Sequence, residues 1–170
     1  MSAAASTLCQ ACGFCCDGTL FGGIRLTEDE ARRPALVRLP LFQTEGGPAL
    51  LFPCPAHSGA CTVYEERPAT CRAYNCHLIV QLEQGDIDLE SALRRVERLR
   101  GLAEAIRPGL EGEEGAFWER AEALQQRPFA WQIENEALMI QIATLREMLA
   151  RFIDARSRHG GTTAEGAGPR

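Results

Sequence analysis

The chain of 170 residues contains no lysine, and all 18 of its basic residues are arginine. The missing amine excludes a lysine Schiff base and a lysine general base from any chemistry done by this chain. Because 23 acidic residues outnumber the arginines, the formal net charge is −5. This balance does not favour a surface that binds nucleic acid or an anionic membrane.

Long apolar runs are absent as well. No segment approaches the roughly 20 apolar residues that a helix needs to cross a bilayer, so we expect no membrane association. Residues 1–8 lack the basic start and the apolar core of a secretory signal, so we expect a cytoplasmic protein. Since cytoplasmic thiols stay reduced, clustered cysteines there indicate metal binding or catalysis before they indicate disulfides.

Cysteine is confined to the first half of the chain, and residues 77–170 contain none. Residues 9–16 carry the pattern C-x2-C-x2-C-C, which contains two overlapping C-x2-C units. A C-x2-C loop lets two thiolates converge on one ion, as in four-cysteine zinc sites and cluster-binding loops. Gly13 permits the tight turn that such a loop needs. The predicted metal ligands are Cys9, Cys12, Cys15, Cys16, Cys54, Cys61, Cys71 and Cys76.

The cysteine count leaves both the arrangement and the metal open. Eight thiols form two four-thiolate sites, or they hold one cluster with four cysteines to spare. Three sulfurs from one loop with a distant fourth are typical of a 4Fe-4S cluster, which favours an iron–sulfur cluster, although the same set suits Zn²⁺. Cys15 and Cys16 are adjacent, and adjacent side chains usually point in different directions, so one of them can serve a second centre.

Two histidines lie within a few residues of a cysteine in the sequence. His77 follows Cys76 and can replace a cysteine as a ligand, whereas His57 lies between Cys54 and Cys61. Neither histidine has metal-ligand spacing of its own. We therefore expect both to lie at the surface or to support the ligands rather than to bind the metal.

Arg67 and Arg72 flank Cys71. A metal held by several thiolates carries net negative charge, which a nearby guanidinium group stabilises. Glu65 and Glu66 offer the arginines alternative partners in an ordinary salt-bridge network. Both interpretations stay open.

Short elements are predicted between the cysteines. Residues 23–26 are typical of a strand, and Thr27 with Glu30 forms a capping box at the start of a short helix. A hairpin is predicted from strands over 48–54 and 61–64, on either side of a Pro- and Gly-containing loop.

Pro68 suits the first position of a short helix over 68–74. A continuous helix would turn Cys71 and Cys76 about 140° from each other. Both can therefore reach one centre only if the helix ends before Cys76, and Asn75 is the expected exit.

The second half is predicted to be helical, over about 88–106, 114–126 and 130–156. Asp88 is the expected N-cap of the first helix, and Pro108-Gly109 is the expected stop. The longest helices carry apolar stripes that suit a core or, alternatively, a dimer or partner interface. The stripe residues are Leu89, Leu93, Val96, Leu99, Leu102 and Ile106 in the first helix, and Leu138, Ile142, Leu145, Leu149 and Phe152 in the third.

These elements predict a small α+β fold. A flexible lead-in over 1–8 precedes a cysteine-cluster, metal-binding domain over 9–82, which has a short hairpin and short helices. A helical region over 83–158 packs on that domain, and the Gly-rich residues 159–170 are predicted to form a disordered tail.

Several of these motifs occur together in a known family. The C-x2-C-x2-C-C pattern, the segment I-R-L-T over 24–27 with Glu30, Cys54, and the segment C-T-V-Y-E-E-R-P-A-T-C-R-A-Y-N-C over 61–76 resemble the YkgJ-like cysteine-cluster family. The resemblance covers residues 9–78 and implies a zinc- or iron-chelating domain that uses the eight cysteines. A related cluster occurs in flagellin lysine methylases. No glycine-rich nucleotide loop follows a strand here, so methylase activity is not carried over.

The sequence thus predicts a metal-binding protein and leaves two alternatives open. One is an iron–sulfur-dependent modifying enzyme or accessory subunit, for which no catalytic residue is identified. The other is a zinc-stapled interaction module, whose helical half binds an unknown protein partner. Nucleic acid is not an expected partner, because residues 1–76 hold six arginines against seven acidic residues. The oligomeric state stays open.

Overall fold

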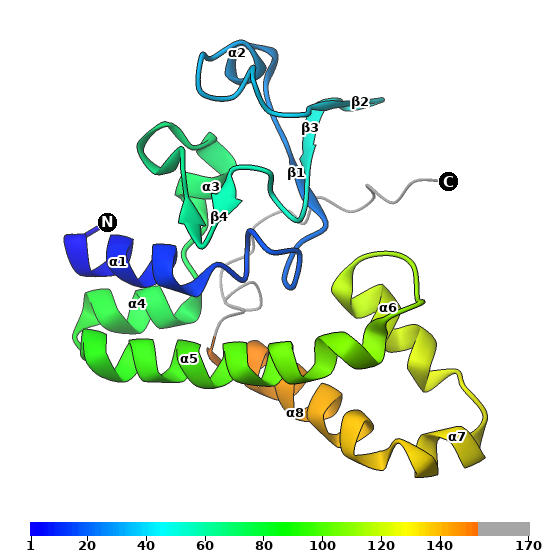
Figure 1. Cartoon of the computed structure of the whole chain (residues 1–170). Helices are drawn as coiled ribbons and strands as arrows, with labels where there is room; N and C mark the ends of the chain where they lie inside the picture. The colour runs from blue at the N-terminus through cyan, green and yellow to red at the C-terminus, as the bar shows by residue number, and fades with distance from the viewer. Residues whose placement is uncertain (153–170) are drawn as a thin grey trace. The chain divides into compact units, whose positions relative to one another are not determined.

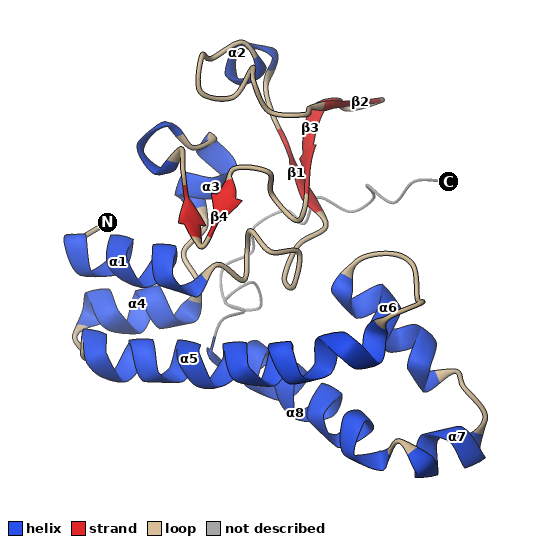
Figure 2. Cartoon of the chain, viewed as in Figure 1, coloured by secondary structure: helices blue, strands red, loops and turns tan. Residues whose placement is uncertain are grey.

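The computed structural model describes residues 1–152. The fold is α+β, as the sequence predicts: helices dominate, and short strands form small antiparallel sheets (Figure 2). The chain separates into two compact units. Within the described residues, unit 1 comprises Met1–Cys12 and residues 76–152, and unit 2 comprises Gly13–Asn75.

Unit 1 is a helical bundle. Its elements are α1 (Ala3–Cys12), α4 (His77–Gln84), α5 (Leu89–Ile106), the 3-10 helix η2 (Arg107–Leu110), α6 (Phe117–Gln125), α7 (Phe129–Glu134) and α8 (Glu136–Phe152). Figure 1 shows α1, α4 and α5 side by side, and α8 packs against α5. Leu8 of α1 and Leu145 of α8 are fully buried, so both helices contribute to the core of the bundle.

Helix α5 begins where the sequence predicts. The carboxylate of Asp88 accepts a hydrogen bond from the backbone N–H of Ser91 at 2.7 Å, which caps the helix. Val96, Leu99 and Ile106 of the predicted stripe are buried, so this stripe faces the bundle core. At Arg107 the chain passes from α5 into η2, and the helical run ends after Leu110, close to the predicted stop at Pro108-Gly109.

The start of the chain contradicts the predicted flexible lead-in over 1–8. These residues form most of α1, because alanine is the strongest helix former and because Ala5 and Leu8 are buried where α1 packs on α5. Helix α4 is not predicted from the sequence; it ends at Gly85, which has a left-handed conformation (φ 80°).

Within the described residues, the predicted helix over 130–156 is broken in two. Asn135 has non-helical angles (φ −112°, ψ 28°), and its side-chain Nδ2 donates to the carbonyl of Trp131 at 2.9 Å. This local bond ends α7 and separates it from α8. The helix predicted over 114–126 is present as α6. The predicted tail over 159–170 lies outside the described residues.

Unit 2 holds the strands. Its elements are β1 (Gly23–Arg25), α2 (Glu28–Ala31), β2 (Phe42–Thr44), β3 (Gly47–Leu51), β4 (His57–Ser58), β5 (Ala60–Cys61), the 3-10 helix η1 (Tyr64–Glu66) and α3 (Ala69–Ala73). Strands β1, β3 and β2 form one antiparallel sheet in that order, and β4 pairs with β5 in a second sheet. The strand predicted over 23–26 is confirmed as β1.

The predicted hairpin of 48–54 with 61–64 is wrong. Both edges of β3 are occupied, one by β1 and one by β2, so no edge remains for a strand that starts at Cys61. Cys61 instead ends a smaller hairpin, in which it lies opposite His57. Strand β2, which joins β3 by a tight turn, is not predicted from the sequence.

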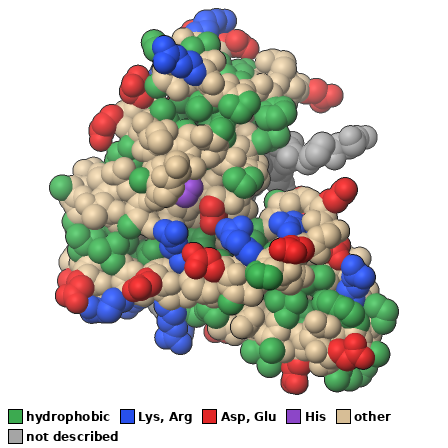
Figure 3. All heavy atoms as spheres, viewed as in Figure 1, with side chains coloured by type: hydrophobic (Ala, Val, Ile, Leu, Met, Phe, Trp, Pro, Cys, Tyr) green, Lys and Arg blue, Asp and Glu red, His purple; other side chains and the backbone are tan. Residues whose placement is uncertain are grey.

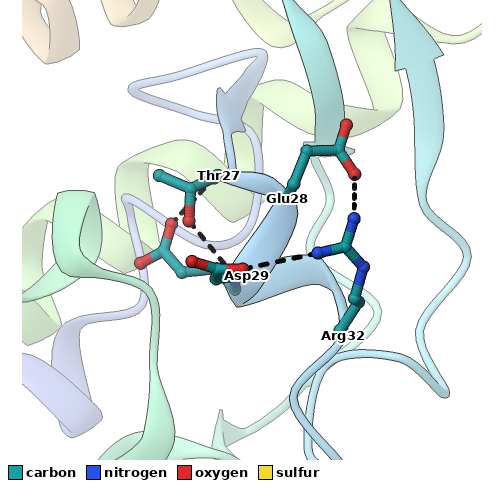
Figure 4. A network of polar contacts seen from close by, with 5 residues as sticks. Thr27, Glu28, Asp29 and Arg32 are labelled. Carbon is teal, nitrogen blue, oxygen red and sulfur yellow. Dashed lines mark hydrogen bonds and ion pairs between the residues drawn. The ribbon is translucent and has the colours of Figure 1, made fainter.

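The predicted capping box at α2 is confirmed. The Thr27 hydroxyl accepts from the backbone N–H of Glu30 at 3.1 Å, and the Glu30 carboxylate accepts from the N–H of Thr27 at 3.0 Å. Figure 4 shows this cap beside the ion pairs of Arg32 with Glu28 (3.3 Å) and Asp29 (3.4 Å). Those pairs are exposed and contribute little to stability.

Helix α3 ends before Cys76, as predicted. Its first residue is Ala69, so Pro68 is the N-cap rather than the first helical residue, and the helix is capped by Tyr74 rather than Asn75. Within residues 1–152, no helix is both long enough and apolar enough to cross a membrane.

Candidate functional site

The two units divide the eight predicted ligands between them. Cys76 is buried, and the other seven cysteines are partly exposed. No disulfide forms within residues 1–152. Unit 1 contains Cys9, Cys12 and Cys76, and unit 2 contains Cys15, Cys16, Cys54, Cys61 and Cys71.

In unit 1, α1 and α4 bring two thiols together that are far apart in the sequence. Cys9 lies in α1, and Cys76 is the N-cap of α4, which packs against α1. Burial raises the pKa of the Cys76 thiol, and the neighbouring Cys9 thiol raises it further, while the backbone N–H of Ile79 acts in the opposite direction. Cys12, three residues after Cys9, lies on the same side of α1.

In unit 2, backbone hydrogen bonds join three segments that carry predicted ligands. The N–H of Cys54 donates to the carbonyl of Cys16 at 2.6 Å, and the N–H of His57 donates to the carbonyl of Cys54 at 2.9 Å. Burial raises the pKa of the Cys54 thiol, the Ala56 backbone N–H lowers it, and the nearby Cys61 thiol raises it. The Cys61 thiol therefore lies close enough to Cys54 to affect its ionisation.

The loop over 13–16 has the tight turn that the sequence predicts. Gly13 has a left-handed backbone conformation (φ 72°), and its carbonyl accepts from the N–H of Cys16 at 2.7 Å and of Asp17 at 2.9 Å. The Asp17 carboxylate in turn accepts from the N–H of Thr19 at 2.9 Å. These bonds fix the path of the chain through the Cys15-Cys16 pair.

His57 lies against this loop. A Cβ atom added to Gly13 would lie 2.8 Å from the Nε2 atom of His57. That nitrogen is buried and has no hydrogen-bond partner within the part of the chain that the structure describes. His57 also lies directly opposite Cys61 in the β4–β5 pair. The spacing of residues does not predict that His57 lies opposite Cys61, because strand pairing sets this position.

Arg67 is buried without an acidic partner. Its Nη1 donates to the carbonyl of Tyr64 at 2.8 Å, and its guanidinium lies 3.7 Å from the centre of the Tyr64 ring. Its Nε and the Tyr64 hydroxyl are buried without hydrogen-bond partners, and Arg67 forms no ion pair within residues 1–152. Arg72, the other arginine beside Cys71, is exposed.

The donor atoms in these segments have the chemistry that zinc and iron prefer, namely thiol sulfur and imidazole nitrogen. The orphaned Nε2 of His57 and the backbone N–H groups near Cys54 and Cys76 also suit a thiolate-bound metal. Among residues 1–152, no three His, Cys, Asp or Glu side chains converge closely enough to hold an ion.

Comparisons of the chain with protein-family models, with curated proteins and with solved structures found no match. The resemblance to the YkgJ-like family therefore stays a prediction that depends on the cysteine motifs.

Proposed function

We propose that this chain is a cytoplasmic metal-binding protein that chelates an iron–sulfur cluster or Zn²⁺ through its cysteines, with one group of thiolates in each unit. One observation carries the proposal. Cys9 lies near enough to Cys76, and Cys61 near enough to Cys54, to affect the ionisation of its partner, although the members of the first pair lie at opposite ends of the cysteine-rich segment. A thiophilic metal needs such converging sulfurs.

Charge near the cysteines supports the same proposal. Thiolates bound to a metal carry negative charge, which backbone N–H groups at a helix start stabilise. Cys76 lies at the start of α4 in this way. Arg67 lies between Cys61 and Cys71 in the sequence, and its buried guanidinium has no acidic partner within residues 1–152. Such a buried positive charge favours an anionic partner.

The metal can be identified by measuring iron, zinc and acid-labile sulfide per chain on protein purified without oxygen. Iron and sulfide in equal amounts would identify an iron–sulfur protein. Zinc without sulfide would identify a structural zinc site. Protein that binds neither metal, as purified or after reconstitution, would contradict the proposed function.

Removal of one thiol from each unit tests the ligand assignment. We expect Cys9→Ser and Cys54→Ser each to lower the bound metal, because each change removes one member of a neighbouring thiol pair. The matched controls Ala11→Ser and Ala60→Ser add a hydroxyl beside Cys12 and Cys61 without removing a thiol. Metal analysis of the four variants checks this prediction, and wild-type metal content in both cysteine variants would contradict it.

A second candidate is an interaction module stapled by zinc. Helix α7 has no buried residue, and Figure 3 shows hydrophobic side chains at the surface over it. Phe129 is 77% exposed, Ile133 is 59% exposed and Ile140 in α8 is 57% exposed. Exposed apolar side chains of this size on neighbouring helices favour a protein contact. Zinc without sulfide in the metal analysis would favour this candidate over a redox role.

A further inference from the structure

We propose that helix α7 and the start of α8 bind an amphipathic helix of another protein, one that carries lysine or arginine beside its apolar stripe. We call this region the α7 surface and define it by Phe129, Ile133, Glu134, Glu136 and Ile140. The inference rests on the second candidate function, the interaction module, and adds the chemistry of its partner.

Helix α7 is held in place by polar contacts rather than by burial. None of its residues is buried, and a helix of this length has little stability of its own in water. The Nε2 of Gln132 donates to the carbonyls of Gln125 (3.0 Å) and Arg127 (2.8 Å), which ties α7 to the end of α6. These bonds fix the position of a helix that exposes Phe129 and Ile133 to solvent.

Phe129 and Ile133 form an apolar ridge. They lie four residues apart in α7, so their side chains share one side of the helix. Figure 3 shows hydrophobic side chains at the surface over this helix. A ridge of side chains with this spacing packs into the groove between the side chains of a second helix. Since α7 and α8 offer no strand edge to which an extended peptide can add, the ridge favours a helical partner.

The charge beside the ridge determines the charge of the partner. Residues 128–145 contain two acidic residues, Glu134 and Glu136, and no arginine. Both are exposed, and neither forms an ion pair with another described residue. Arg127 and Arg146, at the two ends of this stretch, already pair with acidic residues of unit 1. The α7 surface therefore keeps negative charge beside its apolar side chains, which a basic amphipathic helix complements.

A second copy of the chain does not complement the α7 surface. A symmetric dimer would bring the same surface together from both copies. Glu134 and Glu136 of one copy would then meet the same two residues of the other, and like charges at an interface oppose binding. We therefore assign the surface to a different protein.

The probe is a fluorescent synthetic helix of about 14 residues, or four turns, with a leucine stripe flanked by lysines. Fluorescence anisotropy gives its Kd for the full-length chain. One control peptide has glutamate in place of lysine, and the other has serine in place of leucine, so the two separate charge from apolar contact. Circular dichroism reports whether each protein variant folds, and analytical ultracentrifugation reports the oligomeric state.

The apolar ridge is tested with Ile133→Ser. We expect this change to weaken binding of the lysine peptide by about 10-fold or more, because an apolar side chain at the centre of a contact contributes about that much. Val37→Ser is the matched control, because Val37 is 57% exposed and Ile133 is 59% exposed, but Val37 lies in unit 2. Its Kd should match that of wild type.

The charge is tested with the double variant Glu134→Gln and Glu136→Gln. We expect weaker binding of the lysine peptide and a smaller dependence of Kd on salt, because salt screens exposed charges. The double variant Glu65→Gln and Glu66→Gln is the matched control. It removes the same charge from two exposed residues of unit 2 and should match wild type.

Three results would overturn this inference: no binding of the lysine peptide, equal binding of the glutamate peptide, or equal losses in the variants and their controls. A dimer that Ile133→Ser dissociates would assign the α7 surface to a second copy instead. Peptide binding that appears only when residues 153–170 are removed would assign it to that segment. Wild type that binds the lysine peptide but no metal would support this inference and contradict the metal-binding function alone.

Discussion

Gly13 meets two demands at once. Its φ of 72° is a backbone conformation that L side chains rarely adopt, and the His57 ring occupies the place of its missing side chain. Gly59, in the hairpin turn between β4 and β5, meets only the first demand. Its φ is 74°, and nothing lies within 4 Å of an added Cβ. Comparing the same substitution at the two glycines therefore separates the cost of backbone strain from the cost of side-chain crowding.

We expect Gly13→Ala to destabilise unit 2 more than Gly59→Ala. Both changes add left-handed strain of about 1–2 kcal/mol. Gly13→Ala also forces an atom to 2.8 Å from the His57 ring, and crowding of this kind adds about 1–3 kcal/mol. Urea unfolding followed by the near-ultraviolet signal of tyrosine reports on unit 2, since Tyr64 and Tyr74 both lie there. Equal losses of stability in Gly13→Ala and Gly59→Ala would show that the His57 ring moves aside at no cost.

The start of α2 is also tied to the start of α3. One carboxylate oxygen of Glu30 accepts from the N–H of Thr27 within the capping box, and the other accepts from the N–H of Ala69 at 2.7 Å. The residue is buried. These backbone hydrogen bonds, that from Ala69 first, lower the pKa of the Glu30 carboxyl. The ionised side chain therefore connects two short helices that have little apolar surface of their own.

We expect Glu30→Gln to destabilise unit 2 by about 1.5–3 kcal/mol at neutral pH, because hydrogen bonds to a charged acceptor contribute about that much. Since the folded state lowers the pKa of Glu30, its stabilisation is complete above the ordinary carboxyl pKa of about 4.3 and is lost as the pH falls through the lower folded value. The difference between wild type and Glu30→Gln should therefore shrink in acid.

Urea unfolding at a series of pH values measures this difference. Glu28→Gln is the control, because Glu28 lies in the same first turn but is exposed and pairs with the exposed Arg32. Its effect should stay within about 0.5 kcal/mol. A Glu30→Gln effect that does not change with pH would contradict the proposed role of the charge.

The two units differ in how much apolar core they bury. Most of the large buried side chains belong to the helices of unit 1, such as Leu99, Ile142 and Leu145. Unit 2 buries few, among them Phe14, Leu36 and Leu50. A region with a small core gains more of its stability from a bound metal. We therefore expect the proposed metal to contribute most to the stability of unit 2.

Removal of the proposed metal should expose residues 13–75 to protease first. A ligand at 100 times its Kd stabilises the folded state by about 2.7 kcal/mol, so its loss should raise cleavage by about 100-fold where cleavage follows local opening. Trypsin suits the test, because the chain has no lysine and every cleavage site is an arginine. Mass spectrometry of the fragments, with and without chelator, locates the cuts.

Leu145→Ala is the matched control for that experiment. It removes a fully buried side chain of α8 and should destabilise unit 1 by about 2–5 kcal/mol, which the fluorescence of Trp118 and Trp131 reports. The protection of residues 13–75 by metal should persist in this variant. Chelator-induced cleavage that begins in unit 1 would contradict the prediction.

Features set by a few neighbouring residues could be predicted from the sequence. The capping box of Thr27 and Glu30, the cap of Asp88 on α5 and the tight turn at Gly13 are all present. Each depends on a hydrogen bond or a backbone angle within about one turn of chain, so local residue types were enough to predict it.

Features that depend on residues far apart in the sequence could not be predicted from it. Strand β3 pairs with β1 and β2 rather than with a strand at Cys61, and α1 forms where a flexible lead-in was predicted. The same holds for the candidate site, since spacing alone identified the cysteines but not which of them are neighbours. His57 belongs to the candidate site only because the pairing of β4 with β5 places it opposite Cys61, and because its ring lies against Gly13. Residue types state which donors exist, whereas packing and strand pairing decide which donors meet, because those depend on contacts between segments far apart in the chain.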